Sequence, residues 1–153
     1  MSLLPSLSGL TNGAEPLPWL ITSGQPSVAQ LQAAQQAGVT AIIDLRDPME
    51  ARPFDEPEEV ARLGMSYHNF PVSGGALDDA TLDKVLGVLR AQAGTPTMLH
   101  CASANRTGGP LIAFLILDQG MEEQAAVDTA MRAGLRSAEI MEWGLNYART
   151  HRR

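Results

Sequence analysis

The sequence predicts an α/β fold with a short, mostly parallel sheet of four to five strands flanked by helices. Short apolar or β-branched runs alternate along the chain with longer segments of helical periodicity, a pattern typical of βα units. Glycine ends two of the helical segments, at Gly38 and Gly64. The chain has 153 residues, of which 44% are hydrophobic and 18% charged, so it can form one domain with its own core.

The first half of the chain contains three predicted strands. Residues 19–22 (WLIT) form the first, and a helix over residues 27–38 follows, with Ser27 as its N-cap and apolar residues at helical spacing. Residues 39–45 (VTAIIDL) read as a buried strand. A short helix over residues 58–63 leads to the third strand, residues 66–72.

The second half contains one further strand and four helices. A helix over residues 80–92 has Leu82, Val85, Leu86 and Leu89 on one face, and residues 95–100 (TPTMLH) form the fourth strand. Helices are then predicted over residues 108–117, 122–133 and 138–149. The first of these is apolar all round, which is typical of a central buried helix.

Three loops are expected to face one pocket. Right-handed crossovers between parallel strands bring the loops that follow the strands to one edge of the sheet, where ligands bind. Polar residues occur in three such loops, at residues 46–50, 73–75 and 101–107.

The composition excludes several classes of function. Eleven basic and seventeen acidic residues give a net charge of -6, which argues against nucleic acid or an anionic membrane as a partner. A single cysteine allows no internal disulfide, and three scattered histidines (His68, His100, His151) show no metal-ligand spacing. We therefore expect a cytoplasmic protein with no metal and no cofactor. Residues 1–18, which lack signal-peptide features, are interpreted as a loosely packed N-terminal extension, and residues 19–153 as a single domain.

The stretch HCASANRT, His100 to Thr107, joins the fourth strand to the apolar helix. The start of a helix directs unpaired N–H groups and a positive dipole toward such a loop, so an oxyanion fits there. The same surroundings favour the thiolate of Cys101. Arg106 supplies a planar pair of donors for two oxygens of a phosphate or sulfonate. The residue pattern thus predicts a nucleophile and an anion site in one loop.

The stretch resembles the signature of cysteine-dependent protein phosphatases. The whole chain is similar to the small bacterial family of β-lactamase-hydrolase-like, phosphatase-like domains. Four stretches carry this resemblance: SGQPS at 23–27, AIIDLRD at 41–47, YHNFPVSGGALDD at 67–79, and HCASANRT. Members of this family often have four residues between the cysteine and the arginine, as here. The resemblance implies a dual-specificity phosphatase fold with residues 19–153 as the catalytic domain.

The resemblance also implies roles for the loop residues. Cys101 attacks phosphorus to form a phosphocysteine, and Arg106 holds the equatorial oxygens. Thr107 contributes a hydroxyl that assists the thiolate leaving group, and His100 orients the loop. The phosphate is bound by the loop of Ala102, Ser103, Ala104, Asn105 and Arg106. The implied substrate is a phosphorylated small molecule or a phosphoprotein.

Two departures from the family pattern concern Ala104 and the general acid. Ala104 occupies a position where glycine is usual, so either the loop avoids a left-handed backbone there or Asn105 adopts it. Phosphatases generally place an acidic residue after the third strand, where this chain has Ser73, Gly74 and Gly75. The remaining candidates are Asp47, Glu50, Asp78 and Asp79. For Asp78 and Asp79 we favour N-capping of the following helix.

The sequence is compatible with three functions. The first is a phosphatase of the tyrosine or dual-specificity type. The second is a rhodanese-like sulfurtransferase with a persulfide on Cys101, which fits the six-residue span from Cys101 to Arg106 and the missing acid. The third is a non-catalytic phosphate-binding module. Arg132 and Arg136, near the turn AGLRS, either add a second cation to the rim of the pocket or form a solvated helix end, and we favour the solvated helix end.

Overall fold

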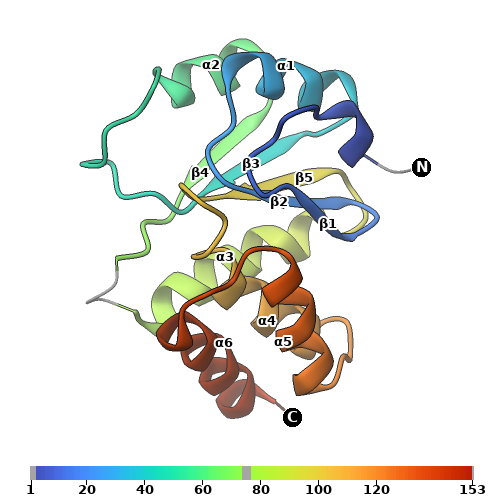
Figure 1. Ribbon diagram of the computed structural model, residues 1–153, viewed down its shortest axis with the longest axis vertical. Helices are drawn as coiled ribbons and strands as arrows, with labels where there is room; N and C mark the ends of the chain where they lie inside the picture. Colours follow the sequence, from blue (N-terminus) through green and yellow to red (C-terminus); the bar gives the residue numbers. More distant parts are fainter. Residues whose placement is uncertain (1–2, 74–76, 153) are drawn as a thin grey trace.

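A five-stranded sheet forms the centre of the molecule, as seen in a computed structural model that describes residues 3–73 and 77–152 (Figure 1). The strands are β1 (Ala14–Leu17), β2 (Leu20–Ser23), β3 (Ala41–Asp44), β4 (Ser66–Asn69) and β5 (Thr97–His100). Their order across the sheet is β1-β2-β5-β3-β4, with β1 antiparallel to β2 and the other pairs parallel. The predicted α/β class with a mostly parallel sheet is therefore confirmed.

Helices cover both faces of this sheet. The helical elements are η1 (Leu4–Ser6), α1 (Val28–Gln36), α2 (Glu56–Arg62), α3 (Asp79–Gln92), α4 (Gly108–Leu117), α5 (Glu123–Arg132) and α6 (Ala138–His151). In Figure 1, α1 and α2 lie above the sheet, and α3 to α6 lie below it. Two hydrophobic clusters match these layers. One contains Ile42 and Met98 with residues of α1 and α2, and the other contains Ile43 and Leu99 with residues of α3 to α6.

Local signals in the sequence account for most helix boundaries. Ser27 caps α1 in a capping box with Gln30, because each side chain accepts a hydrogen bond from the other residue's backbone N–H. Asp78 caps α3 by accepting from the N–H of Thr81 at 2.8 Å. Gly38 follows α1 with a φ of 103°, a left-handed conformation that favours glycine. The predicted helix over residues 108–117 is confirmed with the same bounds.

Three glycines allow α4 to pack closely against its neighbours. A Cβ atom on Gly108 would lie 2.8 Å from the side chain of Leu135. One on Gly109 would lie 2.6 Å from the ring of Trp143, and one on Gly144 would lie 2.5 Å from the carbonyl oxygen of Gly109. The glycine pair that follows the loop is thus required for the packing of α4 against α6 and the turn before it.

The N-terminal segment differs from the prediction of a loosely packed extension. Leu3 and Leu7 are buried in the cluster under α1 and α2. Residues 14–17 form β1, which pairs with β2 at the edge of the sheet. The prediction was wrong because a strand with the sequence AEPL has no periodicity of its own, and its pairing with β2 overrides that weak propensity.

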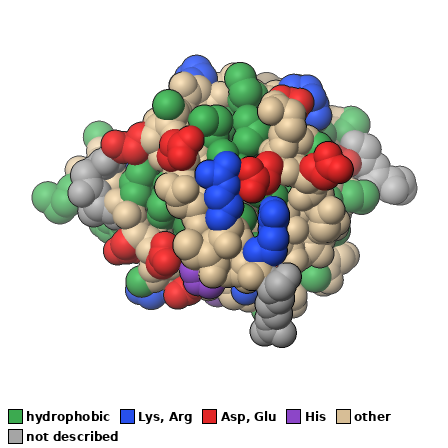
Figure 2. Space-filling view, turned by 90° about the horizontal axis from the view of Figure 1, so that it is seen from below, with side chains coloured by type: hydrophobic (Ala, Val, Ile, Leu, Met, Phe, Trp, Pro, Cys, Tyr) green, Lys and Arg blue, Asp and Glu red, His purple; other side chains and the backbone are tan. Residues whose placement is uncertain are grey.

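Opposite charges are interspersed on the helical side of the molecule. Figure 2 shows this face from below, with basic and acidic side chains next to one another and no large area of one sign. Two of the ion pairs are Arg149 with Glu123 and Arg90 with Asp118. In residues 3–73 and 77–152, no helix combines the length and hydrophobicity needed to cross a lipid bilayer.

Candidate active site

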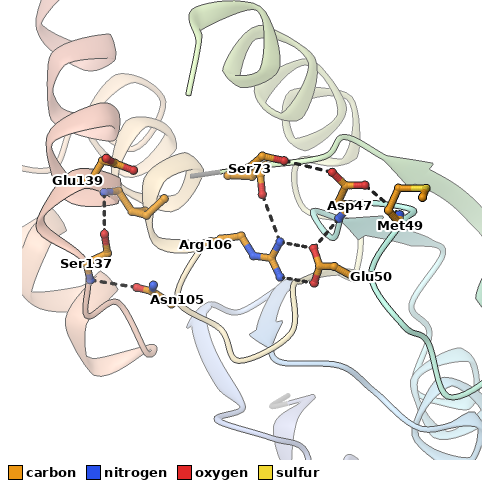
Figure 3. A pocket seen from close by; sticks show the side chains of 10 residues that line it. Asp47, Met49, Glu50, Ser73, Asn105, Arg106, Ser137 and Glu139 are labelled. Carbon is orange, nitrogen blue, oxygen red and sulfur yellow. Dashed lines mark hydrogen bonds and ion pairs between the residues drawn. The ribbon is translucent and has the colours of Figure 1, made fainter. Parts of the chain in front are cut away.

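The loops that follow β3, β4 and β5 meet at one pocket of about 580 Å³ (Figure 3). Its lining residues are Asp47, Met49, Glu50, Val72, Ser73, Asn105, Arg106, Ser137, Glu139 and Ile140. The prediction that these three loops face one pocket is confirmed for the described residues, whereas Gly74 and Gly75 lie outside them. The start of α6 forms a fourth wall that the sequence did not suggest.

The loop from Cys101 to Arg106 is held from its outer side. Ser23 accepts a hydrogen bond from the N–H of Cys101 at 3.2 Å, and the carbonyl oxygen of Ala102 accepts from the N–H of Gln25 at 3.0 Å. The side chain of Asn12 donates to the carbonyl oxygen of Ser103 at 3.0 Å. The SGQPS stretch and the N-terminal segment therefore anchor the loop through its first N–H group and two of its carbonyl groups.

Most N–H groups of the same loop have no partner. Ser103 pairs with Gly24 in an isolated antiparallel bridge, whereas no described acceptor is bonded to the backbone N–H groups of residues 102 and 105–107. They directly precede α4, whose N-terminal end carries the positive end of the helix dipole. A row of unpaired donors at this position is suited to an anion.

Two side chains tie the loop to the turn before α6. The Oδ1 atom of Asn105 accepts from the N–H groups of Arg136 and Ser137 at 2.8 and 3.1 Å. The guanidinium of Arg136 lies 3.2 Å from the hydroxyl of Ser103. The interpretation of Arg136 as a solvated helix end was therefore incomplete, because its exposed guanidinium adds a cation beside the loop. Arg132 instead donates to Thr129 in its own helix.

Ala104 itself adopts the left-handed conformation, with a φ of 72°. The two expected alternatives, a loop that avoids this conformation or one in which Asn105 adopts it, were both wrong. The strain costs an alanine about 1–2 kcal/mol. Thr107, fully buried, donates its hydroxyl to the carbonyl oxygen of Ala104 at 2.8 Å, which helps to hold the strained turn. Gly134, next to Ala104, leaves room for its methyl group, since a Cβ on Gly134 would lie 2.9 Å away.

Arg106 forms a two-pronged ion pair with Glu50. Its two Nη atoms lie 2.7 and 2.9 Å from the carboxylate oxygens, and Nη1 also donates to the carbonyl oxygen of Val72 at 3.2 Å. The hydrogen bond from Arg106 lowers the pKa of Glu50 to about 2, against the opposing effect of burial. Glu50 is therefore ionised and is not suited to the role of a proton donor.

The side chain of Cys101 lies next to that of Arg106. The pKa of Arg106 is raised first by the hydrogen bond that it donates to Glu50, and the charge of the Cys101 thiolate form acts in the same direction. The cysteine itself is fully buried and belongs to the core cluster with Leu99 and Leu111. In this conformation the thiol does not line the pocket, whereas Asn105 and Arg106 of the same loop do.

The candidates for the general acid lie in different parts of the structure. Asp47 lines the pocket, where it accepts from the N–H of Met49 at 2.9 Å and from the hydroxyl of Ser73 at 3.2 Å. Asp78 is exposed, and the hydrogen bond from the N–H of Thr81 lowers its pKa. The preferred interpretation of Asp78 as an N-cap is therefore confirmed, and the neighbouring Asp79 lies in the first turn of the same helix.

Glu139 also lines the pocket and was not selected from the sequence. It lies in the first turn of α6, 33 residues after Arg106. The sequence had no signal for it, because only the close packing of α6 on α4 brings this turn to the loop.

Comparisons with known proteins agree on the fold. No family model and no curated protein matches the chain. A candidate phosphatase of the DUF442 group from Shewanella putrefaciens CN-32 superposes with a TM-score of 0.80 at 20% identity, over 97% of this chain and 98% of that one. TpbA from Pseudomonas aeruginosa gives 0.71 at 23% identity over 92% and 84%, and a second structure of TpbA contains phosphotyrosine.

The kinase-associated phosphatase, solved with its catalytic-site cysteine replaced by serine, gives a TM-score of 0.74 at 12% identity over 86% of each chain. These neighbours are cysteine phosphatases or candidate phosphatases of the dual-specificity and tyrosine type. Their identities with this chain are low, so the likeness concerns the architecture. The chain therefore has the dual-specificity phosphatase-like fold that its sequence predicted.

Proposed function

We propose that this protein is a cysteine-dependent phosphatase that hydrolyses phosphate monoesters through a phosphocysteine on Cys101. The observation that carries the proposal is the set of unpaired N–H groups at residues 102 and 105–107, at the start of α4 and next to the guanidinium of Arg106. Several donors and a cation fit the oxygens of a phosphoryl group better than a neutral ligand. The fold shared with known phosphatases supports the same assignment.

In the first step, the thiolate sulfur of Cys101 attacks phosphorus. A sulfur–phosphorus bond forms and the ester phosphorus–oxygen bond breaks. The backbone of Ala102, Ser103, Ala104 and Asn105 stabilises the charge that develops on the phosphoryl oxygens, together with Arg106. We assign Asp47, whose carboxyl group lines the pocket, to protonate the leaving oxygen.

In the second step, water attacks the phosphocysteine and releases inorganic phosphate. The sulfur–phosphorus bond breaks and the thiolate returns. Thr107, whose hydroxyl is bonded to the loop in the described conformation, is proposed to turn it toward the departing sulfur. Because Cys101 is fully buried in this conformation, the groups that cover its sulfur must move before either step.

Sulfur transfer is the second candidate. It is favoured by the six-residue span from Cys101 to Arg106 and by Ser73, which stands where phosphatases generally place an acid. In that reaction Cys101 takes sulfur from a donor and holds it as a persulfide, and the same loop binds the oxyanion that leaves.

One set of assays separates the candidates. The purified protein is tested with an aryl phosphate and, separately, with thiosulfate plus cyanide, beside Cys101→Ser and Arg106→Ala variants. We expect phosphate release that is lost in Cys101→Ser and falls by at least about 10²-fold in Arg106→Ala. Thiocyanate formation without phosphate release would overturn the proposal in favour of sulfur transfer. Vanadate binding with neither activity would indicate a binding module.

A further inference from the structure

A buried polar network lies on the opposite face of β5 from the thiol. His100 and Asp44 are fully buried, and Glu56 is 1% exposed. The Nε2 atom of His100 lies 2.5 Å from a carboxylate oxygen of Glu56, and its Nδ1 atom lies 3.1 Å from the carbonyl oxygen of Cys101. His100 thus connects helix α2 to the residue that carries the nucleophile.

Both ring nitrogens of His100 face atoms that accept hydrogen bonds. The carbonyl oxygen of Cys101 has no hydrogen to donate, and the carboxylate form of a glutamate side chain only accepts. A neutral imidazole has one N–H group, so in one of these two contacts the lone pair of the unprotonated ring nitrogen would face a lone pair of the acceptor oxygen. Only the doubly protonated imidazolium donates to both partners.

The charges around the ring point to the same form. Arg52 lies 2.5 Å from a carboxylate oxygen of Asp44 and 3.8 Å from one of Glu56. Two buried carboxylates therefore face one arginine, and a charged His100 balances the second. A buried carboxylate without a cation is strongly unfavourable.

The described titratable and charged groups that face His100 come from five parts of the chain. They are Asp44 of β3, Arg52 before α2, Glu56 of α2, Tyr67 of β4 and Cys101 of the loop. Burial alone would lower the pKa of His100, but Glu56 and, more weakly, Asp44 outweigh burial and raise it.

Further hydrogen bonds fix the orientation of the two carboxylates. Gln25 donates its side-chain N–H to Glu56 at 2.6 Å, and Arg46 supports Gln25 through a bond of 2.7 Å. Tyr67 donates its hydroxyl to Asp44 at 2.6 Å. The glutamine of SGQPS therefore holds the partner of His100 and, through its backbone, the loop itself.

A metal ion is not needed to explain this network. Asp44, Glu56 and His100 lie close enough to share one ion. However, both oxygens of each carboxylate and both nitrogens of the ring already have protein partners. Arg52 occupies the position that a cation would take.

We propose that Glu56 is a positioning residue for the nucleophile: it holds His100 as an imidazolium, which fixes the Cys101 carbonyl group and favours the thiolate of Cys101. This inference rests on the proposed function only in so far as Cys101 is the nucleophile. A positive charge one residue from the sulfur stabilises the thiolate, and the hydrogen bond to the carbonyl group orients the start of the loop.

The test uses Glu56→Gln and, as a control on the same helix, Glu58→Gln, whose parent side chain is exposed. The chain has one cysteine, so every alkylated thiol is Cys101. The rate of alkylation by iodoacetamide is measured from pH 4 to 10 in the folded proteins. We expect the midpoint of the profile to rise by about one pH unit or more in Glu56→Gln and to stay unchanged in Glu58→Gln.

A second readout follows the ring directly. Nitrogen-15 NMR of the wild-type protein, assigned with a His100→Gln variant, is expected to show both ring nitrogens of His100 protonated at pH 7. A singly protonated ring at that pH, or an unchanged alkylation midpoint in folded Glu56→Gln, would overturn the inference. If Glu56→Gln does not fold, the wild-type ring measurement still decides.

Neither readout depends on turnover. A protein without phosphatase activity that shows the shifted midpoint would refute the proposed function and leave the role of Glu56 intact. An active phosphatase with an unshifted midpoint would refute the role of Glu56 alone.

Discussion

The approach of α6 to α4 is close enough that one added methyl group should disturb it. A Cβ on Gly144 would lie 2.5 Å from the carbonyl oxygen of Gly109 and 3.2 Å from its carbonyl carbon and Cα. All of these are backbone atoms of a buried helix, so no side chain can rotate away. The Gly144→Ala substitution therefore has to push the two helices apart.

The size of the effect follows from two opposing contributions. Non-bonded heavy atoms normally lie about 3.5–4.0 Å apart, so the helices must separate locally by about 1 Å. Overpacking of this kind costs about 1–3 kcal/mol, and the backbone contact favours the upper end. Alanine gains about 1 kcal/mol in helix propensity over glycine. We expect a net loss of about 2 kcal/mol, or about 4–8 °C in Tm for a chain of this size.

The assay is chemical denaturation followed by tryptophan fluorescence, which reports on Trp143 next to Gly109. The matched control is Gly87→Ala in α3, an exposed position where a Cβ would meet nothing within 4 Å. That variant should gain about 1 kcal/mol from helix propensity. A Gly144→Ala protein as stable as the wild type, or more stable, would show that α4 and α6 do not approach this closely.

Two further predictions concern the pocket. Asp47→Asn should lower turnover of an alkyl phosphate by about 10²–10⁴-fold and turnover of an aryl phosphate with a good leaving group only a few-fold. The control, Asp128→Asn at an exposed position, should change neither rate. Equal losses on both substrates would contradict the role of Asp47 as the acid. The pKa of Glu50 is lowered from 4.5 to about 2, so the stability it contributes is present above pH 4.5 and is lost as the pH falls toward 2. The Glu50 side chain is 30% exposed, so we expect the free energy of unfolding to fall by about 1–2 kcal/mol between pH 6 and pH 2, measured by chemical denaturation. This fall should be missing in Glu50→Gln. The same dependence of stability on pH in both proteins would contradict the prediction.

Local signals allowed much of the fold to be predicted. The capping box at Ser27, the cap at Asp78 and the apolar α4 each have a cause within a few residues of sequence. Strand β1 has no such cause, because its pairing with β2 comes from the fold around it. The strand predicted over residues 19–22 is as long as β2 but begins one residue earlier, whereas the predicted strands at β3, β4 and β5 were longer than the observed ones.

The site was predictable only where its residues are neighbours in the chain. The loop Cys101 to Arg106 could be identified from its spacing. The partners of that loop could not, because Glu50 lies 56 residues before Arg106 and Glu56 lies 44 residues before His100. Glu56 stands in an acidic cluster between Pro53 and Pro57, a composition that indicates an exposed connection. Its burial becomes understandable only once His100 is opposite it.

The most direct test of the account is to identify the atom that receives the phosphoryl group. The protein is mixed with an aryl phosphate, quenched in acid within the first turnover, digested and analysed by mass spectrometry. We predict a phosphoryl adduct on the peptide that contains Cys101, and neither adduct nor phosphate release in Cys101→Ser. Phosphate release that persists in Cys101→Ser, with no adduct on the wild-type cysteine, would contradict catalysis through a phosphocysteine on Cys101.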